Sequence, residues 1–223
     1  MLEEQLYYFI INFSNIYICD YFLCKILTKK ARWYQLHFVV NTLTVIKILP
    51  NIINIIIDPK NNYKTTSNIS NIYSNFHLCL HIYHFLLFKN LNKWDYFHHI
   101  IFAFFGIIPG MLFINTNQLL FHKISCAGLP GMIEYSSLVL YKHNYIKKIN
   151  QKKINMILYI FLRLPLCMIG VIYNYISYIN NYIDDSLLIS IYVNMMLYLN
   201  GTIFTLLTCN SYYKEKENLY KLN

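Results

Sequence analysis

The chain has 223 residues, of which 57% are hydrophobic and only 13% are charged. A typical soluble domain carries about 25% charged residues, so the composition excludes an ordinary soluble enzyme, and the aromatic share of 17% excludes a disordered chain. The net charge of +9 does not indicate a nucleic-acid partner, because the lysines lie between long apolar runs. We therefore expect an all-α, polytopic membrane helix bundle.

The long apolar runs predict the membrane spans, because a spanning helix needs about 20 mostly apolar residues. Seven segments are candidates, in chain order Leu6–Leu23, Leu36–Ile57, Asn71–Phe88, Phe97–Ile114, Leu119–Tyr141, Ile154–Ile179 and Ser186–Cys209. The third is the weakest candidate because it contains three histidines. The fourth and fifth are joined only by residues 115–118, so we expect a tight hairpin there.

The lysines and arginines predict the orientation, because positive charge accumulates in cytoplasmic loops. With the N-terminus outside, the outer loops receive only Lys60 and Lys64. The inner loops and the tail receive Lys25, Lys29, Lys30, Arg32, Lys89, Lys93, Lys142, Lys147, Lys148, Lys152, Lys153, Lys214, Lys216 and Lys221. We therefore expect a lumenal N-terminus, a cytosolic C-terminus and glycosylation at Asn68, which begins an Asn-Ile-Ser sequon in an outer loop.

Charged residues inside the predicted spans need a partner or a polar cavity, because each costs at least about 2.5–3.5 kcal/mol in the bilayer interior. Glu134 and Arg163 are predicted at similar depths in adjacent antiparallel spans, roughly 10–14 Å from the inner ends. We expect these two residues to pair, either locking two helices together or forming the wall of a substrate-binding cavity. Lys47, close to Pro50, is expected to face Glu134 or to extend toward the membrane surface.

Four histidines are predicted to converge at the inner end of the bundle, namely His37, His84, His98 and His99. Adjacent residues point about 100° apart on a helix, so one of His98 and His99 can face a cavity while the other packs between helices. A neutral imidazole can act as a general base toward a hydroxyl or an amine. The alternative is that these are interfacial side chains satisfied by water and lipid headgroups.

A metal site is a further alternative. His77, His81 and His84 share one helix face, and with His98 and His99 they resemble the histidine boxes of membrane di-iron hydroxylases and desaturases. Those enzymes use HxxHH boxes, which this chain lacks, and the remaining histidines, His122 and His143, lie in unsuitable positions. We therefore expect neither a metal nor another cofactor.

Four stretches of the chain resemble motifs of the TLC-domain family, which includes the TRAM translocon-associated proteins, the ceramide synthases and a set of lipid-homeostasis proteins. They are Lys93-Trp-Asp-Tyr-Phe-His-His99, Trp33-Tyr-Gln-Leu-His37, Leu129-Pro-Gly-Met-Ile-Glu-Tyr-Ser-Ser137 and Phe161-Leu-Arg-Leu-Pro165. The resemblance implies an N-terminal span and inner loop (1–29), a TLC-like membrane domain (30–210) and a polar tail (211–223). It also implies about six core helices around a central, lipid-facing cavity.

The resemblance implies a multi-pass protein of the endoplasmic reticulum or a related internal membrane that binds or processes membrane lipid, including sphingolipid. His98 and His99 are then the catalytic candidates, and the substrate-binding candidates are His37, His84, Glu134 and Arg163. One alternative is a ceramide-synthase-like N-acyltransferase that uses acyl-CoA, although the acidic signature of those enzymes is missing before Glu134. Another is a non-enzymatic translocon-associated protein or membrane chaperone, so the sequence leaves open whether the chain is an enzyme.

Overall fold

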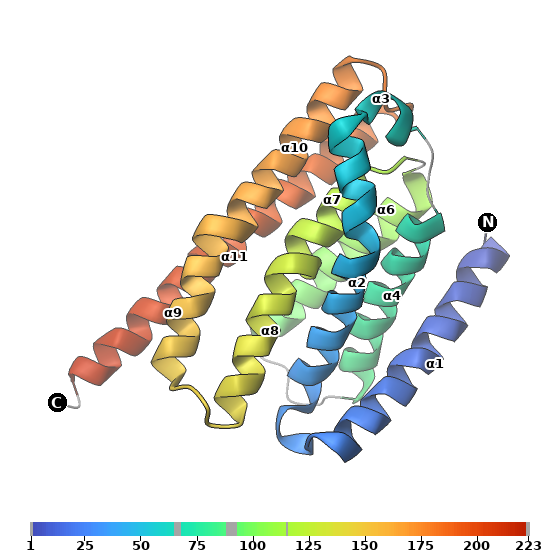
Figure 1. Ribbon diagram of the computed structural model, residues 1–223. Helices are drawn as coiled ribbons and strands as arrows, with labels where there is room; N and C mark the ends of the chain where they lie inside the picture. The colour runs from blue at the N-terminus through green and yellow to red at the C-terminus, as the bar shows by residue number, and fades with distance from the viewer. Residues whose placement is uncertain (1, 65–67, 88–92, 115, 222–223) are drawn as a thin grey trace.

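The computed structural model describes residues 2–64, 68–87, 93–114 and 116–221, and these residues form helices and no β-strand (Figure 1). The first part of the chain contains α1 (Leu2–Ile26), η1 (Lys29–Ala31), α2 (Arg32–Ile57), α3 (Pro59–Asn62), α4 (Asn68–Leu87), α5 (Lys93–Phe97), η2 (His98–Ile107) and α6 (Ile108–Phe113). The second part contains α7 (Leu119–His122), η3 (Lys123–Gly128), α8 (Leu129–Lys142), α9 (Lys148–Leu158), η4 (Tyr159–Arg163), α10 (Leu164–Ile179) and α11 (Leu187–Tyr220). The predicted all-α class is confirmed.

Five helices of the described residues are long and apolar enough to cross a membrane, namely Gln5–Ile26, Lys29–Ile57, Lys93–Phe113, Lys148–Ile179 and Leu187–Tyr220. The third and fifth predicted spans are also helical, as α4 and as the continuous helix formed by α7, η3 and α8. Both contain buried polar side chains, among them the histidines of α4 and Lys123 of η3, which lower their hydropathy. The structure supports a membrane protein with five candidate spans, and the count of seven stays a prediction.

The surface of the bundle is apolar while much of its interior is polar. Large hydrophobic side chains are exposed along the helices, including Tyr17, Phe22, Ile46, Phe105, Ile172 and Leu206. Polar side chains are buried between the helices, including Asn41, Thr44, Asn75, Gln118 and Asn174. Water disfavours such an apolar exterior, whereas the hydrocarbon core of a bilayer is a suitable solvent for it. This distribution supports the membrane assignment independently of helix length.

The two ends of the bundle differ in charge. The α1–α2 turn, the α8–α9 loop and the C-terminus lie at one end, which we call the basic end (Figure 1). The short helix α3 lies at the opposite end with the link between α10 and α11. Lysines crowd the basic end, for example Lys29, Lys30, Lys142, Lys147 and Lys148, as the loops predict. The side chain of the predicted acceptor Asn68 and the whole of Lys89 lie outside the described residues.

Three prolines widen the helices that precede them. Pro109, Pro130 and Pro165 each lie two residues after the end of a π-helical segment, which is η2, η3 and η4 respectively. Proline has no backbone N–H, and its ring clashes with the carbonyl group four residues earlier, so the preceding turn opens. The three segments contain His98 and His99, Lys123, and Arg163. The wide turns therefore coincide with basic and histidine residues inside the helices.

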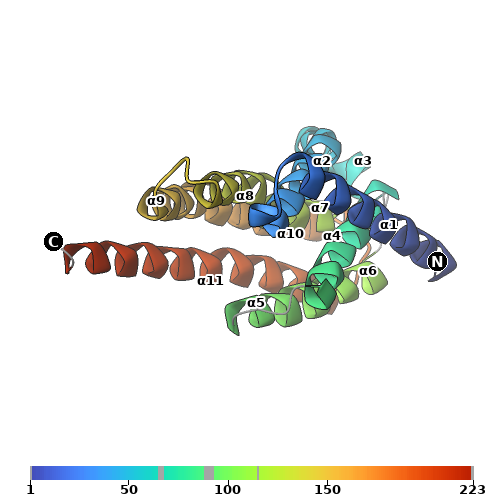
Figure 2. The same cartoon turned by 90° about the horizontal axis from the view of Figure 1, so that it is seen from below.

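Glycines allow α10 and α11 to approach closely along their length. A Cβ atom at Gly201 would lie 2.8 Å from Cβ of Cys167, and one at Gly170 would lie 2.9 Å from Cδ2 of Leu197. Small residues at such crossings are characteristic of membrane helix packing. Seen from below, α11 and the α5–α6 helix line one side of the bundle, and α9, α8 and α2 line the other (Figure 2). The polar interior lies between these two sides.

Candidate functional site

Six histidines form one group between α2, α4 and η2, which we call the histidine cluster. Its members are His37 of α2, His77, His81 and His84 of α4, and His98 and His99 of η2. All except His98 are at most 8% exposed. The spacing i, i+4 and i+7 places the three α4 members on one helix face. The structure thus brings together His37, His84, His98 and His99, and their chemical roles stay predictions.

Three rings of the cluster form a line of hydrogen bonds, which we call the imidazole chain. Nδ1 of His84 lies 3.0 Å from Nε2 of His99, and Nδ1 of His99 lies 3.1 Å from Nδ1 of His81. A neutral imidazole has one N–H and one lone pair, so His99 accepts from one neighbour and donates to the other. When each ring accepts a proton on one nitrogen and releases one from the other, a proton is transferred from one end of the line to the other. The imidazole chain can therefore carry a proton between His84 and His81.

Aromatic rings cover the cluster on the side of His37 and His84. The Trp33 ring stacks on His84 with ring centroids 3.4 Å apart, and it lies 3.7 Å from the centroid of His37. Tyr135 of α8 packs edge-on against His37 at 4.3 Å. His77 is fixed separately, because its Nδ1 lies 2.9 Å from the carbonyl oxygen of Tyr73. The rings are thus held by specific contacts rather than by water alone.

A pocket of about 100 Å³ lies beside the cluster, and we call it the histidine pocket. Its wall is mostly apolar, with polar groups from Ser74, His77, His81, His98, His122, Lys123 and Asn200. Nδ1 of His98 is buried and has no hydrogen-bond partner among the described residues. His98 therefore faces the pocket while His99 is engaged in the imidazole chain, which is the division of roles expected for two adjacent helical residues.

Glu134 and Arg163 meet at a shared hydroxyl group rather than in a direct ion pair. The Tyr159 hydroxyl donates to Oε2 of Glu134 at 2.5 Å, and Nη1 of Arg163 donates to the same hydroxyl at 3.0 Å. The expected direct contact is therefore wrong, because the phenol of Tyr159 lies between the two charges. The sequence contains a signal for Tyr159, since it precedes Arg163 by four residues and shares its helix face.

The network around Arg163 lies behind the pocket wall. Nη2 of Arg163 donates to Oδ1 of Asn200 at 2.6 Å, and Asn200 lines the pocket. The guanidinium group also lies 5.1 Å from the ring centroid of Phe204, which in turn lies 5.3 Å from that of His98. Among the predicted site residues, His98 lines the pocket, whereas His37, His84, His99, Glu134 and Arg163 do not. These five residues can support the pocket only through their neighbours.

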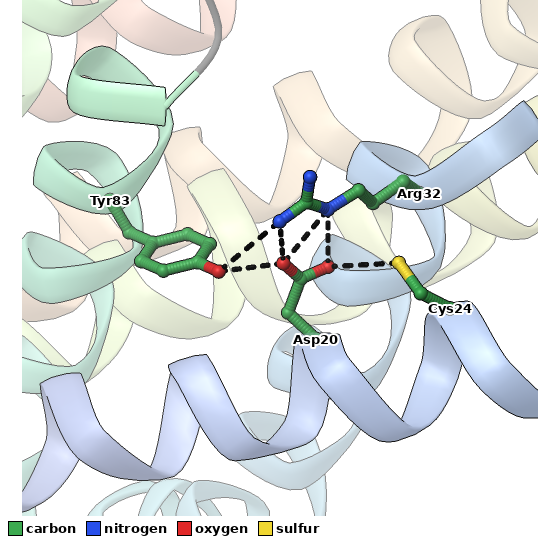
Figure 3. A network of polar contacts seen from close by, with 4 residues as sticks. All are labelled: Asp20, Cys24, Arg32 and Tyr83. Carbon is green, nitrogen blue, oxygen red and sulfur yellow. Dashed lines mark hydrogen bonds and ion pairs between the residues drawn. The ribbon is translucent and has the colours of Figure 1, made fainter. Parts of the chain in front are cut away.

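A second polar group joins α1, α2 and α4, and we call it the aspartate clamp (Figure 3). Asp20 is 1% exposed and accepts hydrogen bonds from Nε of Arg32 at 2.9 Å and from the Tyr83 hydroxyl at 2.6 Å. Nη2 of Arg32 completes the ion pair, and Sγ of Cys24 lies 3.6 Å from Oδ1. Because Tyr83 directly precedes His84, the clamp also anchors the end of α4 that carries the imidazole chain.

The sequence reasoning missed the clamp and misplaced one histidine. It treats Arg32 only as a loop charge, although an aspartate inside an apolar span is itself a signal that a cation lies nearby. It places His122 away from the other histidines, but His122 lines the histidine pocket next to Lys123. His143 lies outside the cluster, with Nε2 3.3 Å from Nε2 of Gln35. Lys47 is exposed on α2, so it does not face Glu134.

No three His, Cys, Asp or Glu side chains within residues 2–64, 68–87, 93–114 and 116–221 are arranged to hold a metal ion. The imidazole chain uses both ring nitrogens of His99 and one nitrogen each of His81 and His84.

No family model, curated protein or solved structure matches this chain. The chemistry of the histidine pocket is therefore the basis on which a function can be argued.

Proposed function

We propose that this chain is an integral membrane protein of the TLC type that binds or processes membrane lipid in the histidine pocket. In this proposal α4 and the α7–η3–α8 helix complete about seven spans in the endoplasmic reticulum or a related internal membrane. The concentration of lysine at the basic end supports a cytosolic C-terminus and a lumenal N-terminus. The order and spacing of the four TLC-like motifs support the family.

The observation that carries the proposal is the partnerless Nδ1 of His98 at the wall of a mostly apolar pocket, within the part of the chain that the structure describes. An apolar wall suits the hydrocarbon part of a lipid, and a neutral imidazole suits a lipid hydroxyl or amine. The ring of His98 lies 5.0 Å from that of His81, where the imidazole chain begins. In this proposal a proton taken by His98 passes to the neighbouring ring of His81 and then along the imidazole chain through His99 to His84.

The test is lipid analysis of cells that express the wild-type protein or single variants at equal protein level. His98→Ala should abolish the lipid change that the wild-type protein causes, because removing a general base commonly costs about 10²–10⁴-fold in rate. His99→Ala should reduce the change less, since it interrupts the onward path and leaves the base in place. His143→Ala, outside the cluster, is the matched control.

Two outcomes would contradict a catalytic role for His98. If His98→Ala lowers protein abundance but each remaining molecule keeps its full effect, the histidine is structural. If abundance is normal and only the amount of co-purified lipid falls, the protein binds lipid without transforming it. Iron at a stoichiometric level in the purified protein would instead indicate an oxidase centred on the histidine cluster.

A further inference from the structure

A buried positive charge lies at the start of η3. The side chain of Lys123 is 7% exposed, and its Nζ contacts two neutral groups, Oγ of Ser70 at 3.4 Å and the carbonyl oxygen of Leu119 at 3.5 Å. None of the ion pairs found among the described residues includes Lys123. An ammonium group inside a membrane bundle is costly without a counter-ion, so a bound anion would stabilise the charged form of Lys123.

Lys123 lines the histidine pocket next to a second group that lacks a partner. Nε2 of His122 is buried and makes no hydrogen bond within the described part of the chain, and His122 lines the same pocket. The other ring nitrogen of His122 is held by the backbone of Val193, so in the neutral imidazole Nδ1 carries the hydrogen and Nε2 is an acceptor. Lys123 is therefore the donor of the two, and its charge strengthens a hydrogen bond to a carboxylate.

The rest of the pocket limits the size and polarity of its occupant. Phe102, Ile107, Leu119 and Met196 form an apolar wall, and the pocket is open on one side. Pockets that enclose a whole drug-sized ligand have volumes of about 300–1,000 Å³, so a pocket of about 100 Å³ takes only a compact head and the start of one chain. A glycerophospholipid head with two acyl chains is too large for this space.

We infer that the histidine pocket binds a single-chain fatty acid, with its carboxylate held by Lys123 and its chain leaving along the apolar wall. This inference deepens the proposed function, since it uses the same pocket and names the class of lipid. It also gives Lys123 the counter-ion that the described residues do not provide. His98 lines the same pocket, so its ring then lies beside the bound ligand.

The inference can be tested with the purified full-length protein in detergent, by equilibrium binding of radiolabelled palmitic acid and of hexadecanol. The two probes share a chain length and differ in the charge of the head group. The wild-type protein should bind palmitate at least about tenfold more tightly than hexadecanol, because a charge-assisted hydrogen bond is lost with the alcohol. Lys123→Met should remove this preference and leave hexadecanol binding unchanged. Lys47→Met, which neutralises an exposed lysine of α2, should behave as the wild-type protein.

Three results would overturn the inference. They are equal binding of palmitate and hexadecanol by the wild-type protein, an undiminished preference in Lys123→Met, and tighter binding of phosphatidic acid than of palmitate. If Lys123→Met does not fold, the comparison of the two probes on the wild-type protein decides alone. If the palmitate preference is absent while His98→Ala still abolishes the cellular lipid change, this inference fails and the proposed function stands. If instead the palmitate preference is present and His98→Ala leaves the cellular lipid change intact, the pocket is a fatty-acid site and the processing role of His98 is wrong.

Discussion

The aspartate clamp and the histidine pocket are both polar sites inside an apolar bundle, and they differ in how their groups are partnered. In the clamp, the carboxylate of Asp20 receives hydrogen bonds from a guanidinium group, a phenol and a thiol. In the pocket, Lys123 contacts only neutral oxygens, and nitrogen atoms of His98 and His122 have no partner among the described residues.

The difference separates polar residues that hold the fold from polar residues that are held for a ligand. A buried charge with complete hydrogen bonding stabilises the arrangement that satisfies it, and removing one partner is costly. A buried charge without a counter-ion lowers stability in the unliganded protein, and an anionic ligand would remove that cost. Variants of each site can test this distinction through the thermal stability of the detergent-purified protein.

The largest effect is expected at the clamp. Asp20→Ala leaves Arg32 and the Tyr83 hydroxyl without their acceptor, so we expect a loss of about 3 kcal/mol or more in the free energy of unfolding. Asp184→Ala removes an exposed aspartate and is the matched control. Equal melting temperatures for the two variants would show that the clamp does not hold the helices together. The double variant Asp20→Leu/Arg32→Met should lose less free energy of unfolding than the sum of the losses of the two single variants.

A smaller loss is expected at the shared hydroxyl of Tyr159. Tyr159→Phe removes one group that both Glu134 and Arg163 contact, and we expect a cost of about 1–3 kcal/mol because buried partners are left unsatisfied. Glu134→Gln and Arg163→Met should show non-additive effects on stability in the wild-type background. The coupling between the two substitutions should become smaller when the same single and double variants are made in a protein that also carries Tyr159→Phe. Additivity in both backgrounds would contradict a role for the phenol.

The opposite sign is expected at Lys123. Lys123→Met replaces a buried ammonium group by an apolar side chain of similar length, so the unliganded protein should gain about 1 kcal/mol or more. A loss of stability as large as that of Asp20→Ala would place Lys123 among the structural residues and remove the contrast between the two sites. Measuring the melting temperature with and without palmitate separates the two cases, because added palmitate should stabilise the wild-type protein more than the variant.

The smallest effect is expected at the ion pairs of Glu215, where α11 meets α9. Nζ of Lys148 and Nζ of Lys152 lie 2.9 Å and 3.0 Å from Oε2 of Glu215. These side chains are partly exposed, so Glu215→Gln should cost about 0–1 kcal/mol. The difference should disappear at high salt concentration, whereas the effect of Asp20→Ala should persist there. A salt-independent loss would indicate that this end of α11 is more enclosed than its exposure suggests.

Much of the fold could be predicted from the sequence, because apolar runs of spanning length leave helices as the main choice. The α4 segment is predicted as a helix despite its three histidines, and it is helical from Asn68 to Leu87. The convergence of His37 with His84 also follows from the way consecutive spans alternate direction. These features depend on length and order along the chain, which the sequence contains.

The details of the site could not be predicted because they depend on the turns that deviate from 3.6 residues. His122 lies on α7, directly before η3, and lines the same pocket as the histidines of α4, which belong to a span that is not adjacent in the sequence. The contact of Asp20 with Arg32 depends on how the chain turns between α1 and α2. Tyr159 and Arg163 are the first and last residues of η4, so the wide turn sets the positions of both. Pro109, Pro130 and Pro165 are the sequence signal that such turns are present.

The π-helical segment η4 also has a consequence for insertions and deletions. It comprises Tyr159–Arg163, and a π-helical turn contains one residue more than an α-helical turn. Deleting one residue from this turn would restore the α-helical repeat without rotating α9 or α10, whereas the same deletion inside α10 would turn one part of the helix away from its neighbours. A one-residue deletion is therefore expected to disturb the packing of the helices less at this wide turn than within α10, although it would move the polar residues that the turn carries.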